Sequence, residues 1–153
     1  MSFIEVRNFS YTYPGEKTPI LKDLILSVPR GSFVVITGKS GCGKSTLGKA
    51  IAGFLFQDED PHHSGHILIN GTDMANLPLF ETSKSICYVQ QNPEDQFCTL
   101  TVMDEIAFGL ENHCIDSEEI DRRIDQTLKI VNGLNLKYRD LATLSGGEKQ
   151  KVA

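Results

Sequence analysis

The sequence has 153 residues, a length that suits a single globular domain. Its net charge of −5 offers no basic surface for nucleic acid, and no run approaches the roughly 18 apolar residues that cross a bilayer. The N-terminus lacks the layout of a secretion signal, and the cysteines form neither a C-x-x-C pair nor a metal-like cluster with the histidines. We therefore expect a protein of the reducing cytoplasm with free thiols and no nucleic-acid partner.

Most of the predicted strands lie in the first ninety residues. Apolar and charged residues alternate over residues 4–7, and apolar residues at alternate positions of 24–28 share one face. Residues 33–37 are apolar without alternation, which is typical of a strand buried on both faces of a parallel sheet. Residues 65–71 predict a strand that ends in an Asn-Gly hairpin turn, and residues 85–90 predict another short strand.

The helical predictions rest on two apolar stripes. The first covers residues 47–55 and follows a glycine-rich loop. In the second, residues 116–119 carry the capping and acidic residues of a helix start, an apolar stripe follows over residues 120–131, and Gly133 predicts the stop. Two i, i+4 ion pairs are expected on this helix: Glu118 with Arg122 and Glu119 with Arg123.

The glycine-rich loop matches G-x-x-x-x-G-K-[ST], the pattern of a phosphate-binding loop. Its residues are Gly38, Lys39, Ser40, Gly41, Cys42, Gly43, Lys44 and Ser45. Glycines let the backbone curl so that successive N–H groups point at phosphate oxygens, and the following helix adds its positive N-terminal end. A chance match in a glycine-rich turn is the alternative. The apolar strand before the loop and the amphipathic helix after it are the context that the motif requires, so we expect nucleotide binding.

Individual side chains of this loop have predicted roles. Lys44 reaches the β- and γ-phosphates, and the Ser45 hydroxyl ligates Mg²⁺. Thr46 follows within backbone reach of the phosphates. Lys39 is either a solvated cation or an additional phosphate contact.

Further motifs resemble those of the ATP-binding cassette (ABC) family, and they occur in the family's order over the whole chain. Residues 144–147, Leu-Ser-Gly-Gly, resemble the family signature, and Gln91 resembles its Q-loop. Residues 65–71 resemble the hairpin that precedes that loop. Tyr13 stands where the family keeps an aromatic residue for the adenine.

Two short stretches give a narrower resemblance. Residues 92–97 and 104–112 resemble the ATPase subunits of energy-coupling-factor importers, which are related to cobalt and nickel uptake systems and carry vitamins and metal ions. The resemblance implies an ATPase subunit that couples ATP binding and hydrolysis to the import of a small solute, a vitamin or a metal ion. Its ligands would be ATP and Mg²⁺. The sequence does not specify the solute, because other subunits select it.

The resemblance also implies partners and a location. The subunit would pair with a second ABC ATPase, as a homodimer or a heterodimer. The pair would dock as a peripheral assembly on the inner face of the cell membrane. Its membrane partners would be a transmembrane coupling protein and a substrate-binding membrane subunit.

Several site residues outside the loop follow from the resemblance. Tyr13 would offer its ring to the adenine, with Tyr11 as the alternative, and a purely structural strand-edge role for Tyr13 is also open. Gln91 would contact Mg²⁺ or the attacking water, unless it is an ordinary surface residue. The remaining residues would contact the γ-phosphate bound by the partner ATPase: Ser145, Gly146 and Gly147.

Ser145 and Glu148 also have the spacing of a capping box at a helix start. A carboxylate that faced a γ-phosphate would repel it. We therefore expect Glu148 to turn back toward the backbone as a cap.

The resemblance implies an α/β fold, the ABC-type ATPase domain of the P-loop NTPases. This fold has an N-terminal antiparallel β subdomain, a parallel-sheet core with the phosphate loop, and a helical subdomain. Residues 1–90 would form the β-rich and phosphate-loop part, and residues 91–153 the Q-loop and helical part up to the signature. The Asp that organises Mg²⁺, the Glu beside it and the switch His would lie beyond Ala153. We therefore expect a partial domain that hydrolyses ATP negligibly by itself.

Three other functions were weighed against the sequence. A soluble ABC ATPase acting on DNA would usually separate the phosphate loop from the signature by long coiled coils, whereas only one convincing amphipathic helix lies late in that interval. A soluble ABC ATPase acting on ribosomes would carry tandem cassettes and a basic linker, which a longer gene product would reveal. A small nucleotide kinase would carry an arginine-rich lid, and residues 54–100 contain no arginine.

Overall fold

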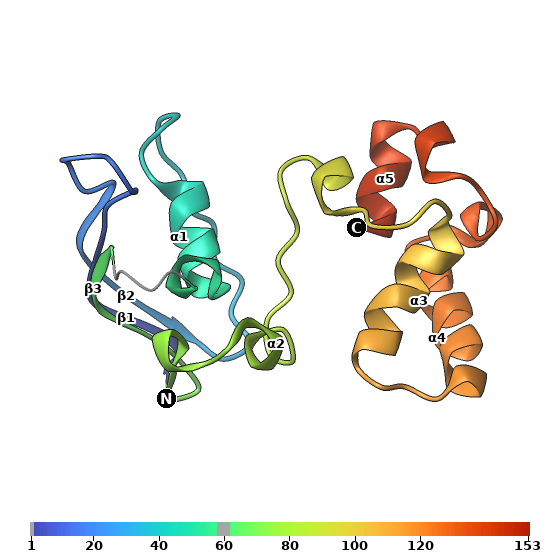
Figure 1. Cartoon of the computed structure of the whole chain (residues 1–153), viewed down its shortest axis with the longest axis horizontal. Coiled ribbons are helices and arrows are strands. Elements are labelled where there is room, and N and C mark those ends of the chain that lie inside the picture. The colour runs from blue at the N-terminus through green and yellow to red at the C-terminus, as the bar shows by residue number, and fades with distance from the viewer. Residues whose placement is uncertain (1, 58–61) are drawn as a thin grey trace. The chain divides into compact units, whose positions relative to one another are not determined.

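The computed structural model describes residues 2–57 and 62–153, which divide into two compact units (Figure 1). The first unit ends at Tyr88, and the second runs from Val89 to Ala153. From the sequence we expected a division after residue 90. The first unit carries the strands and the glycine-rich loop, and the second carries the signature.

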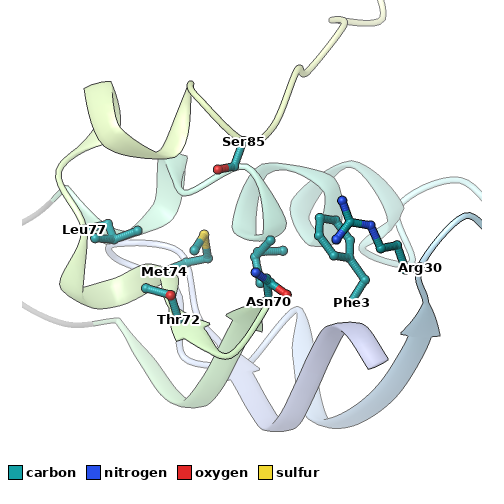
Figure 2. Close-up of a pocket in the computed structure, with 8 residues that line it drawn as sticks. Phe3, Arg30, Asn70, Thr72, Met74, Leu77 and Ser85 are labelled. Atoms are coloured by element: carbon teal, nitrogen blue, oxygen red, sulfur yellow. The ribbon is translucent and has the colours of Figure 1, made fainter. Parts of the chain in front are cut away.

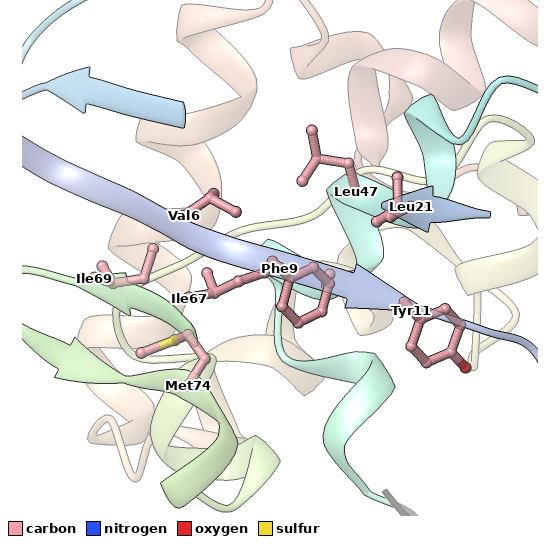
Figure 3. Packing of buried hydrophobic residues seen from close by; sticks show 9 residues of the cluster. Val6, Phe9, Tyr11, Leu21, Leu47, Ile67, Ile69 and Met74 are labelled. Carbon is pink, nitrogen blue, oxygen red and sulfur yellow. The ribbon is translucent and has the colours of Figure 1, made fainter. Parts of the chain in front are cut away.

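The first unit is built on an antiparallel sheet in the order β2-β1-β3-β4. Its strands are β1 (Ser2–Tyr11), β2 (Leu21–Pro29), β3 (His63–Ile69) and β4 (Thr72–Asp73). The predicted strands at residues 4–7 and 24–28 are confirmed and are longer than expected. Alternate side chains lie on the same face of a strand, and one face forms the core of this unit (Figure 3). Phe9 and Ile67 at its centre are fully buried.

An irregularity in β1 keeps its aromatic residues on the core face. The register of β1 against β3 shifts between Arg7 and Ser10, and Asn8 has a φ of 46°. Arg7 and Asn8 are both exposed, so Phe9 returns to the core face. Gly65 of β3 lies directly against this bulge, because a Cβ atom there would lie 2.3 Å from the carbonyl oxygen of Asn8. Only glycine permits such a close approach of two backbones.

The predicted hairpin at residues 65–71 is confirmed. Strands β3 and β4 pair with Ile69 opposite Thr72, which leaves Asn70 and Gly71 as a two-residue turn. These turn residues have φ values of 49° and 85°. Positive φ at both positions is the reason that Asn-Gly is favoured in such turns.

Helix α1 (Lys44–Ile51) follows the glycine-rich loop and packs Leu47 against the core of the sheet. The predicted apolar stripe continues past the end of this helix only in part. Gly53 adopts a φ of 84°, so residues Phe54–Phe56 form a separate short turn, η1. Phe54 is therefore 44% exposed and does not extend the buried stripe. The other short helices of this unit are η2 (Met74–Asn76) and α2 (Leu79–Thr82).

The predictions of strands at residues 33–37 and 85–90 are wrong for the part of the chain that the structure describes. Neither segment pairs with another strand there. A strand requires a hydrogen-bonded neighbour, and the four strands of the antiparallel sheet do not provide one to either segment. The run at 33–37 is accordingly exposed, with Phe33 at 92%. Ile86, in contrast, packs partly against the core of the first unit.

The second unit is helical. Its elements are η3 (Pro93–Gln96), α3 (Val102–Asn112), α4 (Ser117–Ile130), η4 (Leu134–Leu136), η5 (Leu141–Thr143) and α5 (Gly146–Val152). The predicted helix after residue 116 is confirmed as α4, and Ile124 and Leu128 of its stripe are buried together with Val102 of α3. Within residues 2–57 and 62–153, every helix is too short or too polar to cross a bilayer.

The ion pairs on α4 differ in part from the prediction. Glu119 pairs with Arg123 as expected, with 2.8 Å between Oε1 and Nε. Arg122, which we expected opposite Glu118, also donates to Glu119, at 2.7 Å. Both arginines lie about one helical turn from Glu119, so a single carboxylate accepts from both. The hydrogen bond from Arg122, which has the largest effect, and the one from Arg123 lower the pKa of Glu119 to about 2.

Candidate functional site

The glycine-rich loop is held against the sheet at Gly43. Gly41 and Gly43 have φ values of 77° and 95°. A Cβ atom at Gly43 would lie 2.7 Å from Cδ2 of Leu21 and 3.1 Å from the carbonyl oxygen of Ile20. Any side chain here would push the loop away from the sheet, so this glycine fixes the place at which α1 begins.

The Lys44 ammonium lies inside the curl of this loop. Its Nζ donates to the carbonyl oxygens of Gly38, at 2.9 Å, and Lys39, at 2.8 Å. The ammonium carries three donors. Its third contact is a weak one, 3.8 Å to the Sγ of Cys42. A phosphate oxygen in that position would replace a weak contact with a charge-assisted hydrogen bond.

Helix α1 begins without a side-chain cap. Gly43 occupies the N-cap position, and no acidic residue lies in the first turn. The N–H groups of a first turn have no partner within the helix, and the helix dipole makes this end positive. Ser45 is exposed in the same turn and offers a hydroxyl oxygen, a ligand type that Mg²⁺ accepts. The loop, Lys44 and the start of α1 thus combine N–H donors and positive charge suited to a magnesium-bound phosphate.

Tyr13 lies beside the first turn of α1. Its hydroxyl is 3.1 Å from Oγ1 of Thr46, and its ring meets the ring of Tyr11 edge-on at a centroid distance of 5.1 Å. Tyr13 is 38% exposed, whereas Tyr11 is 3% exposed and belongs to the core. Of the two tyrosines, Tyr13 therefore has the accessible ring next to the loop.

The other predicted site residues lie in the second unit. Gln91 is exposed and follows Gln90, whose N–H donates to Oε1 of Gln96 at 3.1 Å. The signature residues Gly146 and Gly147 are exposed at the start of α5. A Cβ atom at either glycine would meet nothing within 4 Å, so a ligand has free access to both.

The predicted capping box at α5 is confirmed. Oε2 of Glu148 accepts hydrogen bonds from the N–H and from the hydroxyl of Ser145, each at 2.8 Å. The Ser145 oxygen in turn accepts from the N–H of Glu148 at 3.4 Å. The hydrogen bond from the Ser145 N–H is the largest cause that lowers the pKa of Glu148, and the hydrogen bond from the Ser145 hydroxyl is the second. The carboxylate is turned back toward the backbone, as the sequence predicts.

Arg139, which no sequence motif indicates, contacts this cap. Its Nη1 donates to Oε1 of Glu148 at 3.0 Å, and its Nη2 donates to the carbonyl oxygen of Thr143 at 2.7 Å. An arginine nine residues before Glu148 matches no helical or strand spacing. The short turn η5 between them brings the two side chains together, and the sequence carried no signal for that turn.

Two hollows among the described residues are lined by other segments than the phosphate loop. The first unit has a cavity of about 330 Å³ (Figure 2), lined by Phe3, Arg30, Ile69, Asn70, Thr72, Met74, Leu77 and Ser85. The second unit has a groove of about 370 Å³, lined by Asn92, Pro93, Glu94, Asp95, Gly146 and Lys149. The loop is therefore assigned as the candidate site by its donors and charge and not by its concavity.

Comparison with known proteins decides the family. The family described as ABC transporter matches residues 21–153. The chain belongs to this family. The predicted family and the predicted fold class, the P-loop ATPase domain of ABC transporters, are thereby confirmed. The parallel sheet expected within that fold does not form among the described residues, whose four strands are antiparallel.

Two curated relatives of this ABC domain cover nearly all of the chain. A provisionally named ABC transporter ATP-binding protein of Methanosarcina acetivorans is 40% identical over 151 residues, which are 99% of this chain and 24% of the relative. A provisionally named HMP/thiamine import ATP-binding protein of Bacillus subtilis is 38% identical over 151 residues, 98% of this chain and 28% of the relative. The chain thus spans about a quarter of the length of these relatives.

Two solved structures have the same fold. One is cbiO1 from Clostridium perfringens, described as part of the ABC transporter complex cbiONQ. It has a TM-score of 0.81 and 29% identity, with 99% of this chain and 59% of that chain covered. The other is the ATP-binding cassette MJ0796, solved as a dimer in a post-hydrolysis state bound to ADP and Pi. It has a TM-score of 0.81 and 26% identity, and the match covers 97% of this chain and 66% of that chain.

Proposed function

We propose that the chain binds magnesium-ATP at residues 38–46, as part of a subunit that couples ATP binding and hydrolysis to the import of a small solute. The observation that carries the proposal is the Lys44 ammonium, held inside a curled loop at the uncapped start of α1. This arrangement supplies a fixed positive charge and several N–H donors within reach of one another. A triphosphate requires both.

Different residues of the first unit bind different parts of the nucleotide. The loop backbone from Gly38 to Gly43 binds the phosphates together with Lys44 and the start of α1. Ser45 ligates Mg²⁺, which offsets the negative charge of the phosphates. Tyr13 supports the adenine with its exposed ring.

The signature of the second unit acts on the nucleotide of a partner chain. Ser145, Gly146 and Gly147 meet the γ-phosphate held by the loop of a second ABC ATPase, identical or homologous. The open surface above both glycines supports this role. The dimeric structure of MJ0796 also supports this role.

The proposal includes membrane partners. The cbiO1 protein belongs to a transporter complex, and the Bacillus subtilis relative is named for HMP/thiamine import. These names support a subunit of a transport complex. We propose that it is peripheral on the inner face of the membrane and bound to a transmembrane coupling protein and a substrate-binding membrane subunit. The HMP/thiamine name also supports a vitamin as the imported solute, and a metal ion is the other solute that the resemblance implies.

For the 153 residues tested by themselves, we propose negligible ATP hydrolysis. Phosphoryl transfer depends on positioned groups and charge, and the resemblance assigns the water-activating carboxylate to a motif outside this sequence.

Nucleotide-dependent association tests the proposed function. The full-length protein that contains this chain is expected to form dimers with Mg²⁺ and a non-hydrolysable ATP analogue, because the signature completes the site only across two chains. Light scattering after size-exclusion chromatography measures the mass. ADP, and the analogue with a chelator in place of Mg²⁺, are the controls that should leave monomers. A mass that stays the same at saturating analogue, both for this protein alone and for its mixture with a homologous ABC ATPase subunit, would contradict the proposal.

A further inference from the structure

The Glu148 carboxylate creates an electrostatic conflict at the signature. It bonds both the hydroxyl and the N–H of Ser145, the residue that is proposed to meet a partner's γ-phosphate. Two negative charges this close repel each other even near the protein surface. A site that accepts phosphate here requires a positive group that offsets the carboxylate.

Arg139 supplies that positive group. Its Nη1 donates to Oε1 of Glu148 at 3.0 Å. Arg139 and Ser145 therefore bond different oxygens of the carboxylate, because Ser145 donates to Oε2. Its Nη2 is fixed by the carbonyl oxygen of Thr143 at 2.7 Å and by the Thr143 hydroxyl at 3.3 Å. The backbone is anchored as well, because the carbonyl oxygen of Arg139 accepts from the N–H of the buried Val102 at 3.1 Å. The guanidinium is thus fixed at both ends.

Lys149, which follows Glu148 in α5, is already engaged. Lys149 pairs with Glu94 across the groove described above. Among the ion pairs of the described residues, Arg139 alone contacts Glu148. The charge of Glu148 therefore depends on this one arginine for its compensation.

We propose that Arg139 is a positioning residue of the signature. It neutralises Glu148 and holds the carboxylate against the cap, so that Ser145 and the two glycines accept the phosphate of a partner's nucleotide. Glu148 is compatible with phosphate binding only while Arg139 is present. This inference rests on the proposed function, because it concerns the same phosphate.

A double-mutant cycle in the full-length protein tests the inference through analogue-dependent dimerisation. Arg139→Gln is expected to weaken dimerisation about fivefold, because an uncompensated carboxylate then faces the phosphate. Glu148→Gln alone is expected to change it less than about twofold, because the charge that it removes is already offset. The double variant is expected to return to within about twofold of the wild type. A merely structural role would give no such recovery, since the bonds from Arg139 to Thr143 are lost in both variants.

Two controls separate charge from structure. Raising the salt concentration should shrink the defect of Arg139→Gln relative to the wild type, because repulsion between exposed charges is screened. Arg139→Lys keeps the charge and should associate nearly as well as the wild type. Thermal unfolding shows whether each variant is folded. If Arg139→Gln does not fold, Arg139→Lys is used for the test in its place.

Three results would overturn the inference: a double variant as weak as Arg139→Gln, a defect that salt leaves unchanged, or a loss of association in folded Arg139→Lys. These results differ from a failure of the proposed function. A wild-type protein that does not associate with the analogue contradicts the proposed function, and the inference with it. A wild-type protein that associates but gives additive mutations contradicts the inference alone.

Discussion

Replacing Lys44 with alanine is expected to lower the affinity for magnesium-ATP about 100-fold or more. The Lys44 ammonium is the positive charge inside the loop, and it also ties the carbonyl groups of Gly38 and Lys39 together. Its removal takes away the charge-assisted contact to phosphate and the bonds that keep the loop curled. Isothermal titration calorimetry of the full-length protein measures the change, with thermal unfolding as the check that the variant is folded.

Lys39→Ala is the matched control for this prediction. It removes the same charge from the same loop, but the side chain of Lys39 is exposed and makes no hydrogen bond or ion pair among the described residues. An exposed charge contributes little, so its loss should change the affinity about threefold at most. Equal losses in the two variants would mean that net charge, and not the position of Lys44, determines binding. A large loss in Lys39→Ala would instead make Lys39 a phosphate contact.

Replacing Gly65 with alanine is expected to destabilise the first unit by about 3 kcal/mol or more. The added Cβ atom would lie 2.3 Å from the carbonyl oxygen of Asn8 and 2.5 Å from that of Arg7. Both are backbone atoms of the β1 bulge, so they cannot move without disturbing the pairing of β1 with β3. The bulge turns Phe9 into the core, and the strand then leads to Tyr13 beside α1. Chemical denaturation should therefore show a loss of stability, and calorimetry a weaker affinity for nucleotide.

Gly71→Ala provides the comparison for Gly65. Gly71 has a φ of 85°, close to the 78° of Gly65, but a Cβ atom there would meet nothing within 4 Å. Only the cost of the left-handed backbone remains, roughly 1–2 kcal/mol. If both variants lost the same stability, the contact between β3 and the bulge would have no energetic role beyond backbone conformation.

Features that depend on neighbouring residues in the sequence were predictable. The Asn-Gly turn after β3, the start of α4 after Asp116 and the capping box of Ser145 with Glu148 each depend on fewer than five consecutive residues. Their geometry is determined by backbone conformation and hydrogen bonds within that short span. The phosphate-loop motif belongs to the same class, and the strand at residues 65–69 was visible for the same reason.

Features that depend on distant segments were predicted less well. A strand at residues 33–37 was expected from apolar composition, but composition does not supply the hydrogen-bonded neighbour that a strand requires. The pattern alone also failed to end α1 at Ile51, because the apolar stripe continues through the left-handed Gly53. In both cases the residues are apolar as expected. The missing information was the hydrogen-bonded neighbour of residues 33–37 and the left-handed conformation of Gly53.

The candidate site shows the same division. Lys44 could be chosen from the motif and Tyr13 from the resemblance, but the sequence left Tyr11 open as the alternative, because it does not show that the Tyr11 ring is buried in the core. Arg139 gave no sequence signal, since its contact with Glu148 is made across the turn η5. Whether Tyr13 supports an adenine remains a prediction of the proposed function.

Hydrogen–deuterium exchange of the full-length protein, with and without saturating magnesium-ATP, tests the central claim most directly, because it locates the nucleotide without any mutation. Peptides that cover residues 38–46 are expected to exchange more slowly with the nucleotide, since their N–H groups would bond phosphate oxygens. Peptides from the hairpin of β3 and β4 should be unaffected. Unchanged exchange at residues 38–46 while calorimetry shows bound nucleotide would contradict the assignment of the phosphates to this loop.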